Sequence, residues 1–324
     1  MAKLWAQHWF TFSLPIAFFV AWFFPNLACR GGWLRPEITT QLGVILIFLI
    51  QGLLLPTQEL RNGLLNWRFH VLVQGFVFLG FPLLGLLVAF LLGPVLPADL
   101  RVGLLYLCVL PSTISSASIL TATARGNVAA AVCAAILSSL LGVILTPLWA
   151  TATLDVAGHS VAFGPVVLTL TKLIVLPLLV GQVLRLTPIR GWSDVRKKLL
   201  GMVGTCVILF IVFAAFCDAA KSRIWTQQGS SLILLAFLGA VGLFVIASGL
   251  VWLFSRLVNL TLADKKAAQF CAVQKTLASG VPMAALIFGQ HPGLGIILLP
   301  LLIYHPLQLA VQGWLAARWG ASEN

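Results

Sequence analysis

The residues best suited to chemistry lie in one short stretch, which reads Gln274-Lys275-Thr276-Leu277-Ala278-Ser279-Gly280-Val281-Pro282. The surrounding segment is apolar and long enough to cross a bilayer, yet the stretch carries a lysine, uncharged polar side chains, a glycine and a proline. A lysine at bilayer depth costs about 2.5–3.5 kcal/mol on insertion scales. Gly280 and Pro282 are expected to break the helix, which a membrane tolerates only where the freed backbone faces protein or water. We therefore predict a binding site at an interrupted helix.

The composition indicates an all-α polytopic membrane protein. Of 324 residues, 60% are hydrophobic and 9% are charged, whereas soluble proteins carry about 25% charged residues. We predict ten transmembrane helices, at about 8–24, 40–55, 68–92, 101–123, 128–149, 163–184, 199–217, 231–255, 267–289 and 293–317. No carboxylate falls in the middle of a span, so an enzyme with an acid–base pair is not expected.

The basic residues predict the orientation. The net charge of +12 does not indicate a nucleic-acid partner, because Lys and Arg gather at the ends of apolar runs, where lipid headgroups lie. Thirteen fall on the side of the N-terminus, including the cluster at 185–198, and five on the other side. By the positive-inside rule, both termini are predicted to lie in the cytoplasm, with the chain in an inner or plasma membrane.

The two halves of the chain, 1–155 and 156–324, show a faint repeat. Ala98-Asp99-Leu100-Arg101 matches Ala263-Asp264-Lys265-Lys266 at an offset of 165, and Thr113-Ile114-Ser115-Ser116 matches Thr276-Leu277-Ala278-Ser279 at an offset of 163. Because each half holds five spans, the second half must lie inverted relative to the first. Inverted repeats are typical of secondary transporters, which bind their substrates where corresponding spans are interrupted.

The fourth span carries the corresponding interruption. Pro111 removes an amide donor and is expected to break the helix there. The hydroxyl-rich run after it contains Ser112, Thr113, Ser115, Ser116 and Ser118. These hydroxyls could instead bond to carbonyls of their own helix or join neighbouring helices. Their position opposite the other interruption favours a site.

These features resemble the bile acid:sodium symporter family. The resemblance rests on the ten spans, on the hydroxyl-rich break followed by Ala124-Arg125-Gly126-Asn127-Val128, and on Gln274 to Ala278, which is most similar to the orphan, member-seven branch of solute carrier family ten. It implies a panel at about 8–55 and 163–217, and a core at about 68–149 and 231–317 in which helices four and nine cross. It also implies alternating-access transport of an organic anion, either bile-acid-like or another amphipathic carboxylate or sulfate.

Sodium-coupled members of that family bind two sodium ions behind the crossing. The resemblance places their third-span glutamine on Gln74, but their Ser-Asn pair on Ala117 and Ser118 and their ninth-span acid on Val273 or Gln274. These departures count against sodium coupling, although shifted hydroxyls of the fourth span could supply oxygens. The candidate sodium ligands are Gln74, Ser115, Ser116 and Gln274.

Lys275 brings a positive charge to this site. We hypothesise that its ammonium stands where family members place a sodium ion, held by carbonyls and hydroxyls of both interruptions. It would neutralise a bound anion or exchange a proton; the alternative is a lysine that reaches an interface along its flexible stem. No cofactor is expected beyond sodium or a proton as coupling ion, and the alternative function is a non-transporting membrane regulator. The full predicted binding set is Gln74, Ser112, Thr113, Ser115, Ser116, Ser118, Gln274, Lys275, Thr276 and Ser279.

Overall fold

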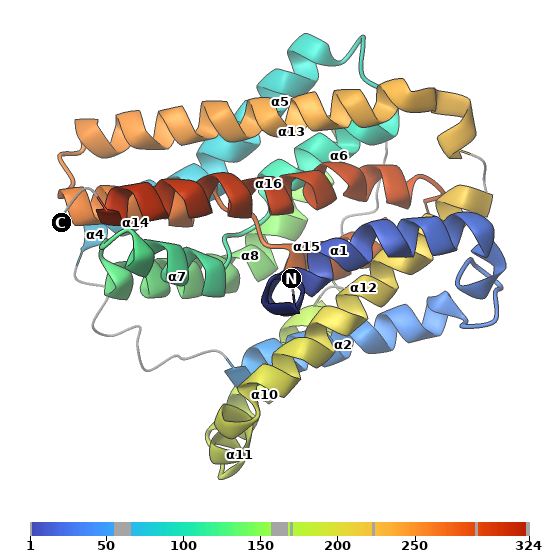
Figure 1. Ribbon diagram of the computed structural model, residues 1–324, viewed down its shortest axis with the longest axis horizontal. Coiled ribbons are helices and arrows are strands. Elements are labelled where there is room, and N and C mark those ends of the chain that lie inside the picture. The colour runs from blue at the N-terminus through green and yellow to red at the C-terminus, as the bar shows by residue number, and fades with distance from the viewer. Residues whose placement is uncertain are drawn as a thin grey trace. The chain divides into compact units, whose positions relative to one another are not determined.

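The computed structural model describes residues 2–54, 66–156, 168, 171–221, 224–288 and 291–321, with side chains for all of these except 2–12, 153–156 and 224–230. The regular structure in these residues is helical throughout (Figure 1). The predicted start of the sixth span at 163 and the predicted end of the ninth at 289 lie outside the described residues. Packing divides the chain into two units, each of which is described by itself.

The first unit consists of Met1–Leu55, Ala162–Leu232 and Ala278–Leu298. Within it, α2 packs against α10 and α12, and α12 packs against α1. Its helices are α1 (Ala2–Phe23), η1 (Pro25–Leu27), α2 (Pro36–Leu54), η4 (Thr171–Val175), α10 (Leu176–Arg185), α11 (Ile189–Val195), α12 (Lys197–Lys221) and most of α15 (Leu277–Ile287).

The second unit consists of Pro56–Val161, Ile233–Leu277 and Leu299–Asn324. Within it, α6 packs against α5 and α8, and α14 packs against α4, α7 and α8. Its helices are α4 (Trp67–Gly75), the π-helical turn η3 (Phe76–Gly80), α5 (Phe81–Leu92), α6 (Ala98–Val109), α7 (Ser115–Thr123), α8 (Val128–Val156), α14 (Leu262–Val273) and most of α13 (Ile224–Leu257) and α16 (Leu294–Ala321).

The helices confirm an all-helical membrane protein. In the described part of the chain, seven helices are long and apolar enough to cross a bilayer, or eight if the pair Thr171–Arg185 and Ile189–Val195, bent by 102°, counts as one span. The predicted fourth span does not pass this test because it is divided into α6 and α7, which are 12 and 9 residues long. The ten-span inverted repeat and its panel and core stay predictions.

The basic cluster at 185–198 contains a short helix, α11, that the sequence pattern did not predict. Arg185 at its start donates to Leu53 O at 2.5 Å and to Asp194 Oδ1 at 3.0 Å, while Gln182 Nε2 donates to Gly52 O. Both acceptor carbonyls lie in the last turn of α2, where a helix has no internal donors for them. The side chains of α10 therefore cap the end of α2.

A node around Asp264 joins the starts of three helices in the second unit. The Asp264 carboxylate is buried and accepts from Asn66 Nδ2 at 2.9 Å, Asn127 Nδ2 at 2.8 Å and Thr261 Oγ1 at 2.8 Å. Asn66 is the N-cap of α4, Asn127 precedes α8, and Thr261 is the N-cap of α14. The Ala-Arg-Gly-Asn turn after α7 is thereby fixed to the start of α14, and the two interrupted helices are held together at one end.

Two glycines bring α2 and α10 into backbone contact. A Cβ atom on Gly181 would lie 2.8 Å from Leu53 N and 2.9 Å from Gly52 Cα. Small residues allow such close approach between membrane helices. Any side chain at Gly181 must therefore push the two helices apart.

We expect Gly181→Val to lower the free energy of unfolding by about 1–3 kcal/mol or more, as overpacking does. The matched control is Gly204→Val in α12, where a Cβ would meet nothing within 4 Å. Thermal unfolding of the purified protein in detergent measures both. Equal losses in the two variants would contradict the close contact.

A candidate binding site at two interrupted helices

The two predicted interruptions meet within the second unit. α6 ends at Val109 and α7 begins at Ser115, while α14 ends at Val273 and α15 begins at Leu277. Thr276 N–H donates to Pro111 O at 3.0 Å, so the two non-helical segments bond directly through their backbones. Pro111 lies within the first interruption as predicted, and its ring packs where a side chain on Gly142 of α8 would otherwise lie.

The second interruption is shorter than predicted, which corrects the helix-breaking role given to Gly280 and Pro282. Both residues lie inside α15, beyond the non-helical residues 274–276. A proline inside a helix deprives the carbonyl four residues earlier of its donor. That carbonyl, Ala278 O, accepts from Gln51 Nε2 at 3.3 Å. The side chain from α2 therefore compensates for the proline, and the helix continues through it.

Lys275 is fully buried, and its ammonium is bound by backbone carbonyls. Nζ donates to Leu110 O at 2.8 Å, to Cys108 O at 3.0 Å and to Val77 O at 3.5 Å. It also lies 4.0 Å from the centroid of the Phe81 ring, a cation–π distance. The burial of Lys275 contradicts the alternative of a lysine that reaches an interface. The predicted hydroxyl groups are not among its hydrogen-bond partners.

Each of the three carbonyls lacks its helical donor for an identifiable reason. Cys108 O would accept from Ser112 in a continuous helix, but Ser112 N–H donates to Ser138 Oγ at 3.0 Å instead. Leu110 has ψ 148°, so the chain leaves the helix there. At the end of η3, the Phe81 N–H group donates to Phe76 O, which lies five residues earlier. In the same pattern, the donor to Val77 O would be the N–H group of residue 82. That residue is Pro82, which has no N–H.

The electrostatics of this arrangement favour a cation. The end of α6 presents the negative end of its helix dipole, where a positive charge is stabilised by up to about 2 kcal/mol in partly buried geometries. An ammonium has three donors, and all three are used by carbonyls. The ion pairs among the described residues join arginines to Asp218 and Asp194, and none includes Lys275. Among the described residues, therefore, no carboxylate forms an ion pair with this ammonium.

Gln274 joins the two interruptions through its side chain. Its Oε1 atom accepts from Thr113 Oγ1 and, at 2.7 Å, from Ser116 Oγ, and those two hydroxyls lie 2.6 Å apart. Three mutually close oxygens thus share two hydroxyl hydrogens, so one of the three contacts has no proton to occupy it. Gln274 Nε2 donates to Gln312 Oε1 at 2.8 Å. This oxygen cluster is the part of the site best suited to a second cation.

A stripe of polar residues on α16 supports the second interruption, and sequence reasoning did not single it out. Tyr304 OH donates to Val273 O at 2.8 Å. Gln308 accepts from Lys275 N–H at 2.8 Å and donates to Lys275 O at 2.9 Å, as a paired strand would. Gln312 donates to Gln269 O at 3.4 Å as well as accepting from Gln274. The signal was available: these three residues recur every four positions, on one face of an apolar span.

The remaining predicted residues are placed differently. Gln74 Nε2 donates to Ala134 O at 2.8 Å, and its Oε1 is buried without a hydrogen-bond partner. Ser112 Oγ is likewise buried and unpartnered. Ser118 Oγ donates to the backbone carbonyl of Ser115, whose side chain is exposed. This is the alternative role considered for these hydroxyls, a bond to a carbonyl of their own helix. Ser279 is buried in α15, beyond the interruption.

Interrupted helices that present freed backbone groups to a buried site are the construction used by secondary transporters. The described residues show this construction in a helical membrane protein whose polar centre lies at two such helices. The sequence matches the SBF-like CPA transporter family over residues 8–321, and the chain belongs to this family. It is therefore a member of a transporter family and not an enzyme.

Named relatives extend the match over nearly the whole chain. The chain is 33% identical to sodium/bile acid cotransporter 7 of Xenopus tropicalis over 328 residues, covering 96% of this chain and 94% of the relative. It is also 33% identical to the proteins of the same name from Rattus norvegicus and Danio rerio, each over 324 residues. These matches cover 96% of this chain, and 94% and 96% of the two relatives. The resemblance seen in the sequence is thereby confirmed at the level of the family.

We expect Gln308→Met to lower the free energy of unfolding by about 1–3 kcal/mol per lost partner, because Lys275 N–H and C=O would be left buried without hydrogen bonds. The control is Gln41→Met, which removes an exposed glutamine from α2. Chemical denaturation followed by tryptophan fluorescence measures both variants. A Gln308 variant as stable as the control would show that water or another group can replace this side chain.

Proposed function

We propose that the protein is a secondary active transporter of an organic anion, working by alternating access, in which the ammonium of Lys275 takes the place of a coupling cation. One observation carries this proposal: the Lys275 ammonium is bound by three freed carbonyls and the Phe81 ring. Rings of backbone carbonyls are what membrane proteins use to replace the hydration shell of a monovalent cation. A covalently attached ammonium occupies such a ring permanently.

The positive charge proposed for Lys275, which pairs with no carboxylate in the described part of the chain, supports an anionic substrate. At an effective dielectric constant of about 20, a unit charge attracts an anion about 10 Å away by roughly 1–2 kcal/mol. All three donors of Lys275 bond to carbonyls, so this attraction acts through space and not through a direct hydrogen bond. The vertebrate relatives are named as sodium/bile acid cotransporters, which favours a bile-acid-like compound or another amphipathic carboxylate or sulfate.

The oxygen cluster of Thr113, Ser116 and Gln274 favours a second coupling mechanism, in which a sodium ion binds. Its three oxygens hold too few hydrogens for their contacts, and oxygen atoms are the ligands that hard cations prefer. In this alternative a sodium ion is co-transported beside a lysine that only stabilises the fold. The other alternative is a membrane regulator that keeps the scaffold and does not transport.

The remaining features of the proposal follow from the resemblance and the charge pattern. The two halves, 1–155 and 156–324, form inverted five-helix repeats. The panel comprises about 8–55 and 163–217, the core about 68–149 and 231–317, and the two move against each other during transport. Both termini lie in the cytoplasm, with the protein in an inner or plasma membrane.

We expect Lys275→Met to abolish uptake of a radiolabelled bile salt or steroid sulfate into proteoliposomes, because the substitution removes the internal cation. Lys265→Met, the same change in the first turn of α14, is the control and should retain uptake. Size-exclusion chromatography establishes that each variant is folded. The wild type should transport equally well when potassium replaces sodium.

Strong sodium dependence of the wild type would exclude the substitution of a cation by Lys275 and favour the oxygen cluster. The comparison of sodium with potassium uses the wild type, so it distinguishes these two mechanisms even if the Lys275 variant does not fold. Specific binding of the same anions without uptake or counterflow would favour the regulator.

We expect a green fluorescent protein fused after Asn324 to fluoresce in bacterial cells, because that reporter folds only in the cytoplasm. Alkaline phosphatase fused at the same position should be inactive, because it requires the oxidising periplasm. Cellular fluorescence and phosphatase activity measure the two fusions. The opposite pattern would place the C-terminus outside and overturn the orientation.

A further inference from the structure

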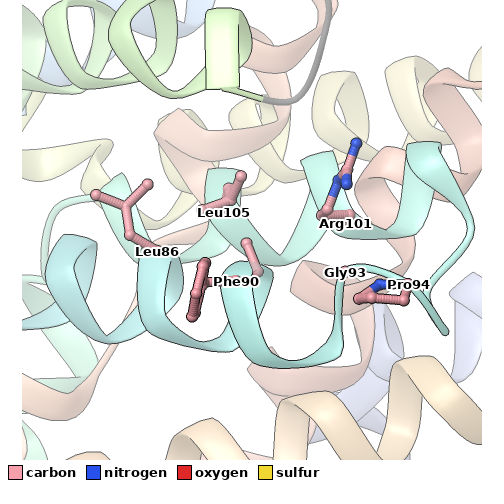
Figure 2. Close-up of a pocket in the computed structure, with 7 residues that line it drawn as sticks. Leu86, Phe90, Gly93, Pro94, Arg101 and Leu105 are labelled. Atoms are coloured by element: carbon pink, nitrogen blue, oxygen red, sulfur yellow. The ribbon is translucent and has the colours of Figure 1, made fainter.

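A groove lies between the end of α5 and the start of α6 (Figure 2). None of its lining residues is among those that bind Lys275 and Gln274. Its volume is about 420 Å³. The residues that matter for its chemistry are Leu86, Phe90, Gly93, Pro94, Arg101 and Leu105. All of them belong to the second unit. Arg101 is the one charged side chain among the described residues that line it.

Polarity changes along the groove. Leu86 lies at one end, Phe90 and Leu105 lie near the middle, and Gly93, Pro94 and Arg101 lie at the other end (Figure 2). The candidate membrane span Trp67–Leu92 ends just before Gly93, so the Arg101 end lies where a bilayer changes from acyl chains to headgroups. An arginine at that depth is well placed to meet a lipid phosphate.

The groove is flanked by a surface suited to lipid. On α5, Phe90 is 81% exposed and Leu91 63% exposed, and Leu83 and Leu87 are also exposed. In a membrane-spanning helix, apolar side chains exposed in this way face acyl chains. An occupant can therefore enter from the bilayer with its apolar part already in contact with this face.

Gly93 lies beside the Arg101 guanidinium. A Cβ atom at this position would lie 3.4 Å from Arg101 Nη1. Arginine binds phosphate with two parallel hydrogen bonds, which gives it an advantage over lysine at such a site.

We propose that this groove binds one anionic phospholipid, with its phosphate on Arg101 and an acyl chain against Leu86, Phe90 and Leu105. Charge complementarity decides the occupant: a single cation at the headgroup end of an apolar groove matches an anionic lipid. The inference does not depend on what the protein transports.

Native mass spectrometry of the full chain from mixed micelles tests this site. The probes are dioleoyl phosphatidylglycerol and dioleoyl phosphatidylcholine at equal concentration. The wild type should retain one phosphatidylglycerol in preference to phosphatidylcholine. Arg101→Gln should weaken that retention about tenfold, because it removes a charge-assisted contact. Arg256→Gln is the matched control, since Arg256 lies at the end of α13 over the Trp252 ring and should leave retention unchanged.

A second variant tests the apolar half. Leu105→Trp fills the groove while leaving Arg101 in place, and it should also lower retention. The proposal would be overturned if a folded Arg101 variant retained as much phosphatidylglycerol as the wild type, or if the Arg256 control lost as much as the Arg101 variant. It would also be overturned if the wild type showed no preference between the two lipids. Competitive displacement of the phosphatidylglycerol by a soluble bile salt that itself stays bound would assign the groove to soluble anions instead.

Discussion

A buried ammonium satisfies the backbone where the second unit departs from helical structure. Breaking a helix inside a membrane leaves carbonyls without donors, and each unsatisfied group costs several kcal/mol because no water reaches it. Lys275 supplies three donors to carbonyls from two separate elements, η3 and the end of α6. The stabilisation is therefore mutual: the carbonyl oxygens accept hydrogen bonds from the buried ammonium, and the ammonium satisfies carbonyls that have no helical donor.

The same requirement explains the surroundings of Lys275. Its own backbone has left the helix, so Gln308 pairs with both its N–H and its C=O. Tyr304 bonds to the last carbonyl of α14. Gln274, whose side chain would otherwise be an unsatisfied buried amide, bonds to hydroxyls of the first interruption and to Gln312. The result is a buried polar centre in which hydrogen bonds join Lys275, both interruptions and α16.

Much of the helical framework could be predicted, because it follows from apolar run length. The segments predicted at 68–92, 128–149 and 231–255 fall within helices of the structure. The two interruptions were found because polar residues and Pro111 are costly inside an apolar run. The length of the second interruption was not predicted correctly. A membrane helix can continue through Pro282 because the side chain of Gln51 donates to the carbonyl that the proline leaves without a donor. Composition cannot reveal such a partner.

The partners of Lys275 were hidden for a similar reason. Carbonyls belong to every residue, so no residue type marks Val77, Cys108 and Leu110 as ligands. Val77 O is left without a helical donor by the π-helical turn together with Pro82, and local propensity does not specify that turn. Gln308 and Gln312 were visible as polar residues four apart in an apolar span, a spacing that places both on one face of the helix.

Chemical rescue of Lys275→Ala tests most directly whether a bound ammonium holds the two interruptions together. Removing the side chain leaves space beside the three carbonyls, and the melting temperature of the variant is measured with and without ethylammonium, with tetramethylammonium as a control of equal charge that has no N–H donor. The account predicts that ethylammonium stabilises the variant well beyond its effect on the wild type, and that tetramethylammonium does not. Equal responses of the variant and the wild type to ethylammonium would contradict it.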